Sequence, residues 1–340
     1  MIRRTIIALS ILLTAFLARQ DLARAAPREW ILGSTAPAGS PAAETVEQVG
    51  HLLEAISGGR IKIKYRMGGI LGDEPDVIRL CQRGQIQVFA GSLSALVSLT
   101  PELRALETPY LFPDPEAYLK VASVLEHGNH PTLQALTQRH GIVLLGMGFL
   151  GWRSIASVRK PIRTPRDLHQ LRVRAMPSDL HPIIWKALGA VPRSFATNEL
   201  NSALDVDVVE AFDLTTFMLF ATNLVDRVRF LTQSRHVPSI AVVAVGAKPW
   251  ASLSAAAQAR LRAGVPAIIA RSNQRHVELE EELITLLPGR GVQVITPTPA
   301  ELAEFKQATR PVEAYVRRTG SKQELELLDL AQRIVRGSSR

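Results

Sequence analysis

Residues 151–174 read GWRSIASVRKPIRTPRDLHQLRVR, in which two short apolar segments flank a connector that contains Pro161 and Pro165. Arg153 follows the apolar run 142–150, and Arg174 ends the second apolar segment. A guanidinium is always charged, and its planar fork of donors fits a carboxylate in a bidentate manner. We therefore expect Arg153 and Arg174 to stand at the ends of neighbouring strands and to bind a small organic anion. The alternative is two solvated arginines, because Arg is mostly exposed in proteins.

The apolar residues of the chain alternate between strand and helix spacing, which predicts an α/β fold. Strands are expected over residues 30–33, 60–65, 85–90, 142–145, 171–175, 237–245 and 292–295. Helices are expected over residues 42–56, 73–82, 116–126, 178–188, 199–204, 254–261 with Ser254 as N-cap, and 266–287, and two more near Pro299 and Gln323.

The N-terminus has the form of a secretory signal peptide over residues 1–25. Arg3 and Arg4 precede a short apolar region that ends near Ala18, and small residues at 23 and 25 suit cleavage. The apolar region is too short to span a bilayer comfortably, although an uncleaved anchor is the alternative. Cys81 is the only cysteine, so we expect no intrachain disulfide and no lipid anchor. These features predict a freely diffusing periplasmic protein.

The charge of the chain is basic without a basic cluster. The formal net charge is +9, and removing residues 1–25 takes away four Arg and one Asp, which leaves +6. There is no long run of like charges and no interleaving of basic with aromatic residues, so nucleic acid is not an expected partner. The remaining excess favours anionic small molecules through long-range attraction.

Two sequence patterns resemble sites found in enzymes, but the residues around each of them do not fit such a site. Residues 146–151, GMGFLG, match a dinucleotide-binding glycine pattern, but Pro161 and Pro165 exclude the long helix which that site requires. We interpret these glycines as flexible backbone between two lobes. His127, His130 and His140 have no carboxylate or cysteine in ligand spacing. The sequence therefore predicts no catalytic residues, no metal and no cofactor.

Further short motifs follow one another along the chain: Gly69-x-Leu-Gly-Asp-Glu, Gly84-Gln-Ile-Gln, Thr108-Pro-Tyr-Leu-Phe, Gly151-x-Arg, Lys160-Pro-Ile-x-Thr-Pro-x-Asp-Leu, Leu171-x-Val-Arg, Leu188-Gly-Ala-x-Pro, Asn198-Glu-Leu-x-Ser-Ala-Leu and Gly291-Val-Gln-Val-Ile-x-Pro. This ordered series resembles the solute-binding proteins of tripartite ATP-independent periplasmic (TRAP) transporters, the DctP-type family. The resemblance covers essentially the whole chain after the signal peptide.

The resemblance implies an α/β, two-lobed periplasmic binding protein fold, in which each lobe has a mixed sheet flanked by helices and a long helix spans both lobes. Lobe I would comprise residues 27–150 and 240–279, and lobe II residues 151–239 and 280–335. A small organic acid would bind in the cleft and close the lobes. The closed protein, expected to be a monomer, would then dock on the membrane subunits of a TRAP permease.

The resemblance also implies which residues bind the ligand. Arg174 would grip the ligand carboxylate, and Arg153 would assist it. Further cleft positions correspond to Thr35, Glu74, Ser92 and Thr197. Two of these have simpler explanations, since Glu74 suits a helix N-terminus and Thr197 suits a helix cap.

Residues 209–214, VEAFDL, depart from the family pattern Val-Asp-Gly-x-Glu-Asn. Leu214 replaces an asparagine that binds ligand in some members, so this wall loses a hydrogen-bonding group. Phe212 and Leu214 would suit a monocarboxylate with an apolar or aromatic tail, and Asp213 or Glu74 would position nearby groups. A ligand sensor of the same fold and a bilobal enzyme that acts on a carboxylate substrate are the alternative functions.

Overall fold

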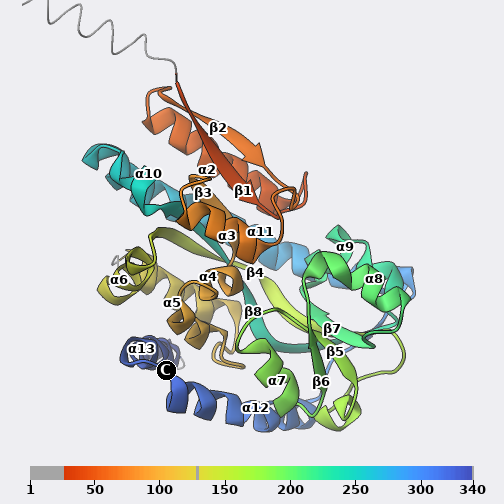
Figure 1. The fold of residues 1–340 in the computed structure, drawn as a ribbon. Helices are drawn as coiled ribbons and strands as arrows, with labels where there is room; N and C mark the ends of the chain where they lie inside the picture. The colour runs from red at the N-terminus through yellow and green to blue at the C-terminus, as the bar shows by residue number, and fades with distance from the viewer. Residues whose placement is uncertain (1–26, 128–129, 339–340) are drawn as a thin grey trace, which may run out of the picture.

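The computed structural model of the protein describes residues 27–127 and 130–338 (Figure 1). The expected signal peptide, residues 1–25, lies outside the described residues. Among the described residues, no helix combines the length and the apolar character that a membrane crossing requires.

The described strands form one mixed nine-stranded sheet in the order β2-β1-β3-β8-β4-β7-β5-β6, with β9 paired to β8. Strand β4 runs antiparallel to β7 and β8, and β8 also runs antiparallel to β3. All other neighbouring strands are parallel. The strands are β1 (Arg28–Ser34), β2 (Ile61–Arg66), β3 (Val88–Ser92), β4 (Ile142–Ser157), β5 (Arg172–Ala175), β6 (Val191–Ser194), β7 (Ala211–Leu214), β8 (Phe230–Gly246) and β9 (Gln293–Ile295).

Two long strands, β4 and β8, carry this sheet from one half of the molecule to the other (Figure 1). They pair Ile142 with Gly246 beside the first half, β1–β3, and Ser157 with Phe230 beside the second half, β5–β7 and β9. The expected mixed sheet flanked by helices is confirmed, but the two halves share it. The strands expected at 142–145 and 237–245 are too short, because apolar residues continue through both strands and the pairing shifts register instead of ending.

Helices cover both faces of the sheet. The α-helices are α2 (Pro41–Ile56), α3 (Glu74–Gln82), α4 (Leu93–Val97), α5 (Pro115–His127), α6 (Pro131–Arg139), α7 (His181–Ala187), α8 (Leu200–Asp205), α9 (Thr216–Ala221), α10 (Ala247–Ala251), α11 (Ala255–Leu286), α12 (Pro299–Thr319) and α13 (Lys322–Ser338). Short 3-10 helices are η1 (Pro101–Glu107), η2 (Pro165–Leu168), η3 (Thr197–Glu199), η4 (Leu224–Arg227) and η5 (Pro288–Arg290).

The alternation of side chains along β8 explains the layers. Val243 and Val245 face one way and pack with residues of α2 and α11, whereas Val242 and Ala244 face the other way and pack with α3, α4 and α5. A third hydrophobic cluster, which includes Leu231, lies around α8, α9 and β7 in the second half. The cluster with Val242 and Ala244 also includes Val173 and Trp185 of the second half, so one hydrophobic core runs through both halves of the sheet.

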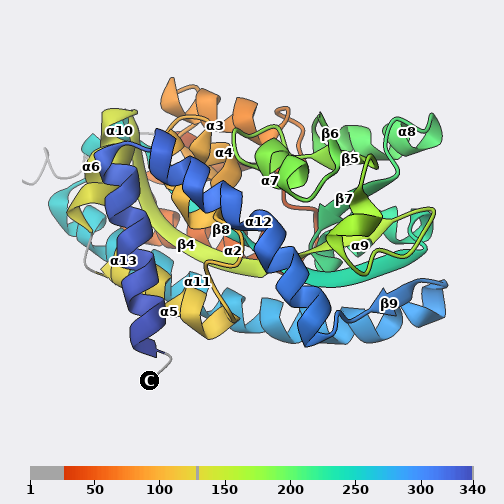
Figure 2. The ribbon, with the colours of Figure 1, turned by 90° about the horizontal axis from the view of Figure 1, so that it is seen from below.

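The long helix α11 runs along both halves (Figure 2), as expected, and contacts α2, β4 and α9. Ser254 is its N-cap, as predicted, and accepts a hydrogen bond from Ala257 N. The predicted break before Pro266 is wrong, because α11 is one helix of 32 residues. A proline inside a helix costs about 3 kcal/mol. Burial of neighbours such as Val265 and Ile269 offsets that cost, at roughly 1.5–3 kcal/mol for each side chain.

The C-terminal helix α13 packs on α5 and η1 of the first half, whereas α12 packs on α7 and η2 of the second (Figure 2). Arg104 of η1 donates through Nε to Glu324 of α13 at 2.8 Å, and both side chains are buried. The predicted division, which placed residues 280–335 together in lobe II, therefore differs from the packing of α13. The difference arises because the turn between α12 and α13 returns the chain to the first half.

The glycine run at residues 146–151 lies inside β4, which crosses from one half to the other, so this crossing is part of a strand and not a loop. Two side chains of α11 hold this part of the strand. Asn273 Oδ1 accepts from Phe149 N at 2.7 Å, and Glu280 Oε2 accepts from Trp152 N at 3.0 Å. Because the β4–β8 register shifts between Phe149 and Trp152, these bonds satisfy backbone groups at the irregularity.

Gly151 is the residue that this irregularity requires. Its φ is +107°, and a Cβ added there would meet Glu280 Oε2 at 2.8 Å. We expect Gly151→Ala to destabilise the protein by about 1–3 kcal/mol, measured by urea unfolding. Gly289→Ala is the matched control, since a Cβ there meets nothing within 4 Å. Equal unfolding midpoints for the two variants would contradict the assignment of strain to Gly151.

Candidate ligand-binding site

A cavity of about 470 Å³ lies where β1 and β3 end, beside the middle of the paired strands β4 and β8. The first half contributes the segments after β1 and β3, the N-terminus of α3, and parts of α2 and α11. The second half contributes β5, η3 and α9. The volume is typical of a site for a small molecule.

Seven of the nine predicted site residues line this cavity, and two do not. The lining residues are Thr35, Glu74, Ser92, Arg153, Arg174, Thr197 and Leu214. Phe212 and Asp213 lie behind the cavity wall. The structure thus brings most of the predicted residues together, while their role in ligand binding stays a prediction.

Arg174, in β5, is 1% exposed and has no acidic hydrogen-bond partner among the described residues. Its Nε donates to the Phe195 carbonyl at 3.0 Å, and its Nη2 donates to Thr197 Oγ1 at 2.9 Å. Its Nη1 has no partner in the described part of the chain. Burial, together with repulsion from Arg153, lowers the pKa of Arg174 to about 10, so the guanidinium is charged at neutral pH. A buried cation with an unused donor is suited to bind an anion.

Arg153 is also buried, but it already has a counterion. Its Nε donates to Asp213 Oδ2 at 2.6 Å, and its Nη2 donates to Oδ1 at 2.9 Å and to the Asp213 carbonyl at 2.7 Å. His236 Nε2 lies 3.2 Å from Asp213 Oδ2. Burial opposes the charge of Asp213, but Arg153 and His236 hold the pKa of this carboxyl well below its usual range. Burial lowers the pKa of His236, which favours its neutral form.

The predicted adjacency of the two arginine-bearing strands is wrong, because β7 lies between β4 and β5. This inserted strand carries Asp213, and Ile155 of β4 pairs with it. The carboxylate thereby reaches Arg153, while Arg174 keeps no such partner. Because of this strand order, a carboxylate neutralises Arg153, whereas Arg174 has no acidic hydrogen-bond partner among the described residues.

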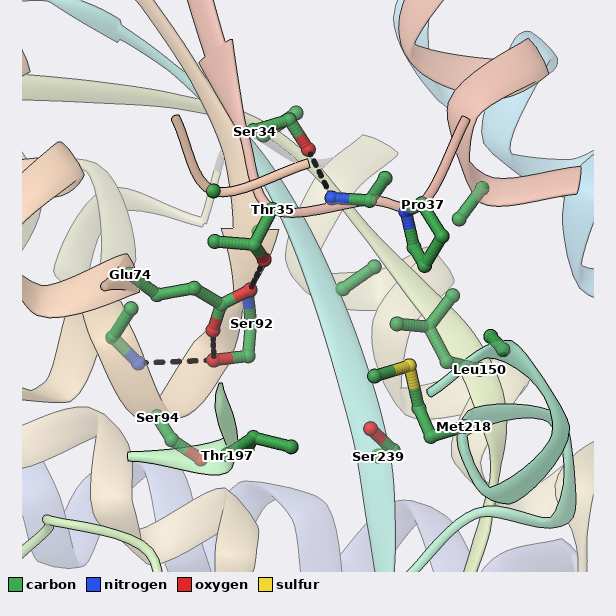
Figure 3. Close-up of a pocket in the computed structure, with 18 of the residues that line it drawn as sticks. Ser34, Thr35, Pro37, Glu74, Ser92, Ser94, Leu150, Thr197, Met218 and Ser239 are labelled. Carbon is green, nitrogen blue, oxygen red and sulfur yellow. Dashed lines mark hydrogen bonds between the residues drawn. The ribbon is translucent and has the colours of Figure 1, made fainter. Parts of the chain in front are cut away.

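Glu74, the first residue of α3, points toward Thr35 and Ser92 (Figure 3). Its Oε1 accepts from Thr35 Oγ1 at 2.7 Å and from Ser92 N at 3.2 Å, and its Oε2 accepts from Ser92 Oγ. Burial raises the pKa of Glu74, and the hydrogen bonds from Ser92 and Thr35 only partly counter that effect. Glu74 is thus more than a charge at a helix N-terminus, because it fixes two other lining residues.

Phe212 was expected in the ligand site, and the structure corrects this. The ring is fully buried among Leu200, Leu219 and Leu231, so it belongs to the core of the second half. Leu214 lies on the same face of β7 but ends the strand, and it reaches the cavity. The apolar wall predicted from Leu214 is present, but Phe212 supports it from behind.

A family model described as bacterial extracellular solute-binding protein, family 7 (DctP), matches residues 32–319. The chain belongs to this family. The match agrees with the resemblance seen in residues 151–174 and in the motifs around them.

Several curated proteins of this kind are similar in sequence. The chain is 24% identical over 245 residues to the 2,3-diketo-L-gulonate-binding periplasmic protein YiaO of Escherichia coli, which covers 72% of this chain and 74% of that protein. It is 28% identical over 197 residues to the C4-dicarboxylate-binding protein DctB of Bacillus subtilis, covering 58% and 55%. Across such relatives the match spans between 51% and 82% of the relative's own length.

Solved structures of TRAP periplasmic solute-binding proteins share the fold. A Bradyrhizobium protein in complex with α/β-D-galacturonate has a TM-score of 0.81 at 28% identity, with 90% of this chain and 99% of that chain covered. A Shewanella oneidensis protein with bound succinate has a TM-score of 0.82 at 22% identity, with 91% and 100% covered. The family fold therefore extends over nearly all the described residues.

Some lining residues of this family member escaped prediction from the sequence. Ser239 of β8, Asn273 of α11, and Phe217 and Met218 of α9 all line the cavity. No short pattern marks them, although Ser239 interrupts an apolar strand and Asn273 lies on the buried side of a helix. Within residues 27–127 and 130–338, no group of three or more His, Cys, Asp or Glu side chains is arranged to hold a metal ion.

Proposed function

We propose that the protein captures a small organic acid in this cavity and delivers it to the membrane subunits of a TRAP-type permease. The observation that carries the proposal is the buried Nη1 of Arg174, which has no partner in the described chain although the guanidinium is charged. A ligand carboxylate at this position would supply the missing counterion. The protein acts by recognition, with Arg174 as the anchor and Thr35, Glu74, Ser92 and Thr197 as the polar surroundings.

Closure of two lobes accompanies binding in this proposal. The lobes follow the predicted division, except that α13 moves with lobe I, on which it packs. The hinge is the paired stretch of β4 and β8 in which the register shifts between Phe149 and Trp152. Closure excludes water, and a lower local dielectric strengthens the attraction between Arg174 and a carboxylate.

The names of similar proteins support an organic acid as the ligand. Their named ligands, 2,3-diketo-L-gulonate, C4-dicarboxylates and galacturonate, are all carboxylic acids. Residues 1–25 act as a cleaved signal peptide, so the protein works in the periplasm. In this proposal the protein works as a monomer.

The test is thermal unfolding of the purified protein with mono- and dicarboxylic acids, neutral sugars and amino acids. A ligand that binds only the native state stabilises it by RT ln(1 + [L]/Kd), about 2.7 kcal/mol at a hundredfold excess over Kd. For a chain of this size we expect a rise in Tm of about 4 °C with one or more acids. A rise with neutral sugars alone, or with no compound at all, would contradict the proposal.

A further inference from the structure

The charges around the cavity are unequally compensated. Among the residues described as lining it, the charged side chains are Arg153, Arg174, Asp73 and Glu74. Asp213 neutralises Arg153 by two hydrogen bonds to its carboxylate, which leaves Arg174 as the uncompensated lining cation. The two lining carboxylates are adjacent residues at the start of α3. One carboxylate on the ligand therefore has a partner, and a second would face desolvation or like charge.

Strands β7 and β4 separate β5, which carries Arg174, from β8, and together with α9 they give the cavity an apolar wall. It consists of Leu150 from β4, Leu214 from β7, and Phe217 and Met218 from α9. In Figure 3, Leu150 and Met218 lie across the cavity from Glu74 and Thr197, and Thr197 is the residue that holds Arg174. The part of a ligand that extends from Arg174 toward β8 would therefore contact hydrocarbon on this wall.

Two neutral hydrogen-bonding side chains line the cavity away from β5: Ser239 stands on β8, which β4 and β7 separate from β5, and Asn273 stands on α11, bonded to Phe149 of β4. Ser239 is near Met218 in Figure 3, and its hydroxyl has no hydrogen-bond partner among the described residues. Asn273 is 7% exposed and lines the cavity. Its Oδ1 is occupied by Phe149 N, which sets the orientation of the amide and leaves Nδ2 as a donor without a partner in the described chain. Both residues stand on long elements, β8 and α11, which hold them in place.

The geometry points to a ligand with a single carboxylate, an apolar middle and a neutral hydrogen-bonding group at its far end, such as a hydroxyl or an amide. Arg174 holds the carboxylate, and Ser239 and Asn273 hold the far group. Acids with a second carboxylate at the far end are rejected. This inference rests on the proposed function and goes further than the apolar character of Leu214, because it assigns the far subsite and the number of charges.

The test compares acids of equal chain length by calorimetric titration of the purified protein. The probes are hexanoate, 6-hydroxyhexanoate and adipate, with the corresponding four-carbon and eight-carbon sets. At the best-fitting length, we expect the hydroxy acid to bind about fivefold tighter than the alkanoate, as one added hydrogen bond allows. We expect the dicarboxylate to bind at least about tenfold weaker than the hydroxy acid, because its second charge is buried without a partner.

The variant Ser239→Ala should lower the ratio of hydroxyhexanoate to hexanoate affinity toward one. Ser252→Ala is the control, because Ser252 follows α10 outside the cavity, and it should keep the wild-type ratio. Arg174-dependent binding in which dicarboxylates equal or exceed hydroxy acids would overturn this inference and leave the proposed function intact. An unchanged ratio in Ser239→Ala would overturn the far subsite. Absence of binding by every acid would overturn both.

Discussion

Replacing Arg174 by alanine is expected to lower the affinity for organic acids by at least about 30-fold. The guanidinium is 1% exposed, so a carboxylate bound to it is shielded from water. Truncating one partner of a buried, hydrogen-bonded charge pair typically costs about 2–5 kcal/mol. Part of this loss comes from the ligand carboxylate, which would be left in a site without a counterion. Calorimetric titration with the acid that raises Tm most measures the loss directly.

Arg193→Ala is the matched control for this variant. Arg193 lies on β6 directly beside Arg174 in the parallel register, but its side chain is exposed. The two variants remove the same formal charge from adjacent strands, so a long-range effect of net charge would appear in both. We expect Arg193→Ala to bind within about twofold of the wild type, since exposed charges contribute little. Equal losses in both variants would contradict the role of Arg174 as the anchor.

The position of Arg174 could be predicted because its signal is local. Residues 171–175 have strand spacing, and an arginine at the end of such a segment follows directly from the chain. The same local reasoning predicted Ser254 as a helix N-cap. It failed at Pro266, since the side chains that keep α11 continuous across the proline are buried by distant parts of the chain. Local patterns thus predicted which helices and strands form better than they predicted where those helices and strands begin and end.

The difference between Arg153 and Arg174 could not be predicted in this way. It depends on β7, which follows β5 in the chain but inserts between β4 and β5 in the sheet. Strand order depends on the packing of the whole domain, so the residues near Arg153 in the sequence do not indicate it. At residues 209–214, the difference from the family pattern predicted a role for Leu214 in the cavity wall. The residue that neutralises Arg153 is its neighbour Asp213.

The second large effect is expected from Asp213→Asn, which leaves Arg153 charged and buried without a carboxylate. Breaking a buried ion pair by removing one partner typically costs about 3–5 kcal/mol. For a chain of this size, that corresponds to a fall in Tm of at least about 4 °C. Asp207→Asn is the control, because Asp207 pairs with Arg159 on the surface, where both side chains are at least half exposed. Its expected effect is within about 1 kcal/mol.

The pH dependence gives this variant a second signature. The pKa of Asp213 is held well below its usual range in the folded protein, after burial is outweighed by Arg153 and His236. A depressed folded-state pKa means that the stabilisation is fully present above the unfolded-state pKa, near 3.9, and is lost as the pH falls through the folded-state value. The stability difference between wild type and Asp213→Asn should therefore be constant near neutral pH and shrink below about pH 4. A difference that grows with acid would contradict this pairing.

The same substitution also tests how charge is distributed in the cavity. Without Asp213, the guanidinium of Arg153 becomes a second uncompensated cation on the cavity wall. A dicarboxylate would then have two partners, so the ratio of adipate to hexanoate affinity should rise in Asp213→Asn and stay at the wild-type value in Asp207→Asn. If adipate gains nothing, the carboxylate of Asp213 does not govern how many charges the ligand carries. Because the variant loses stability while the ratio rises, this readout separates the control of specificity from damage to the fold.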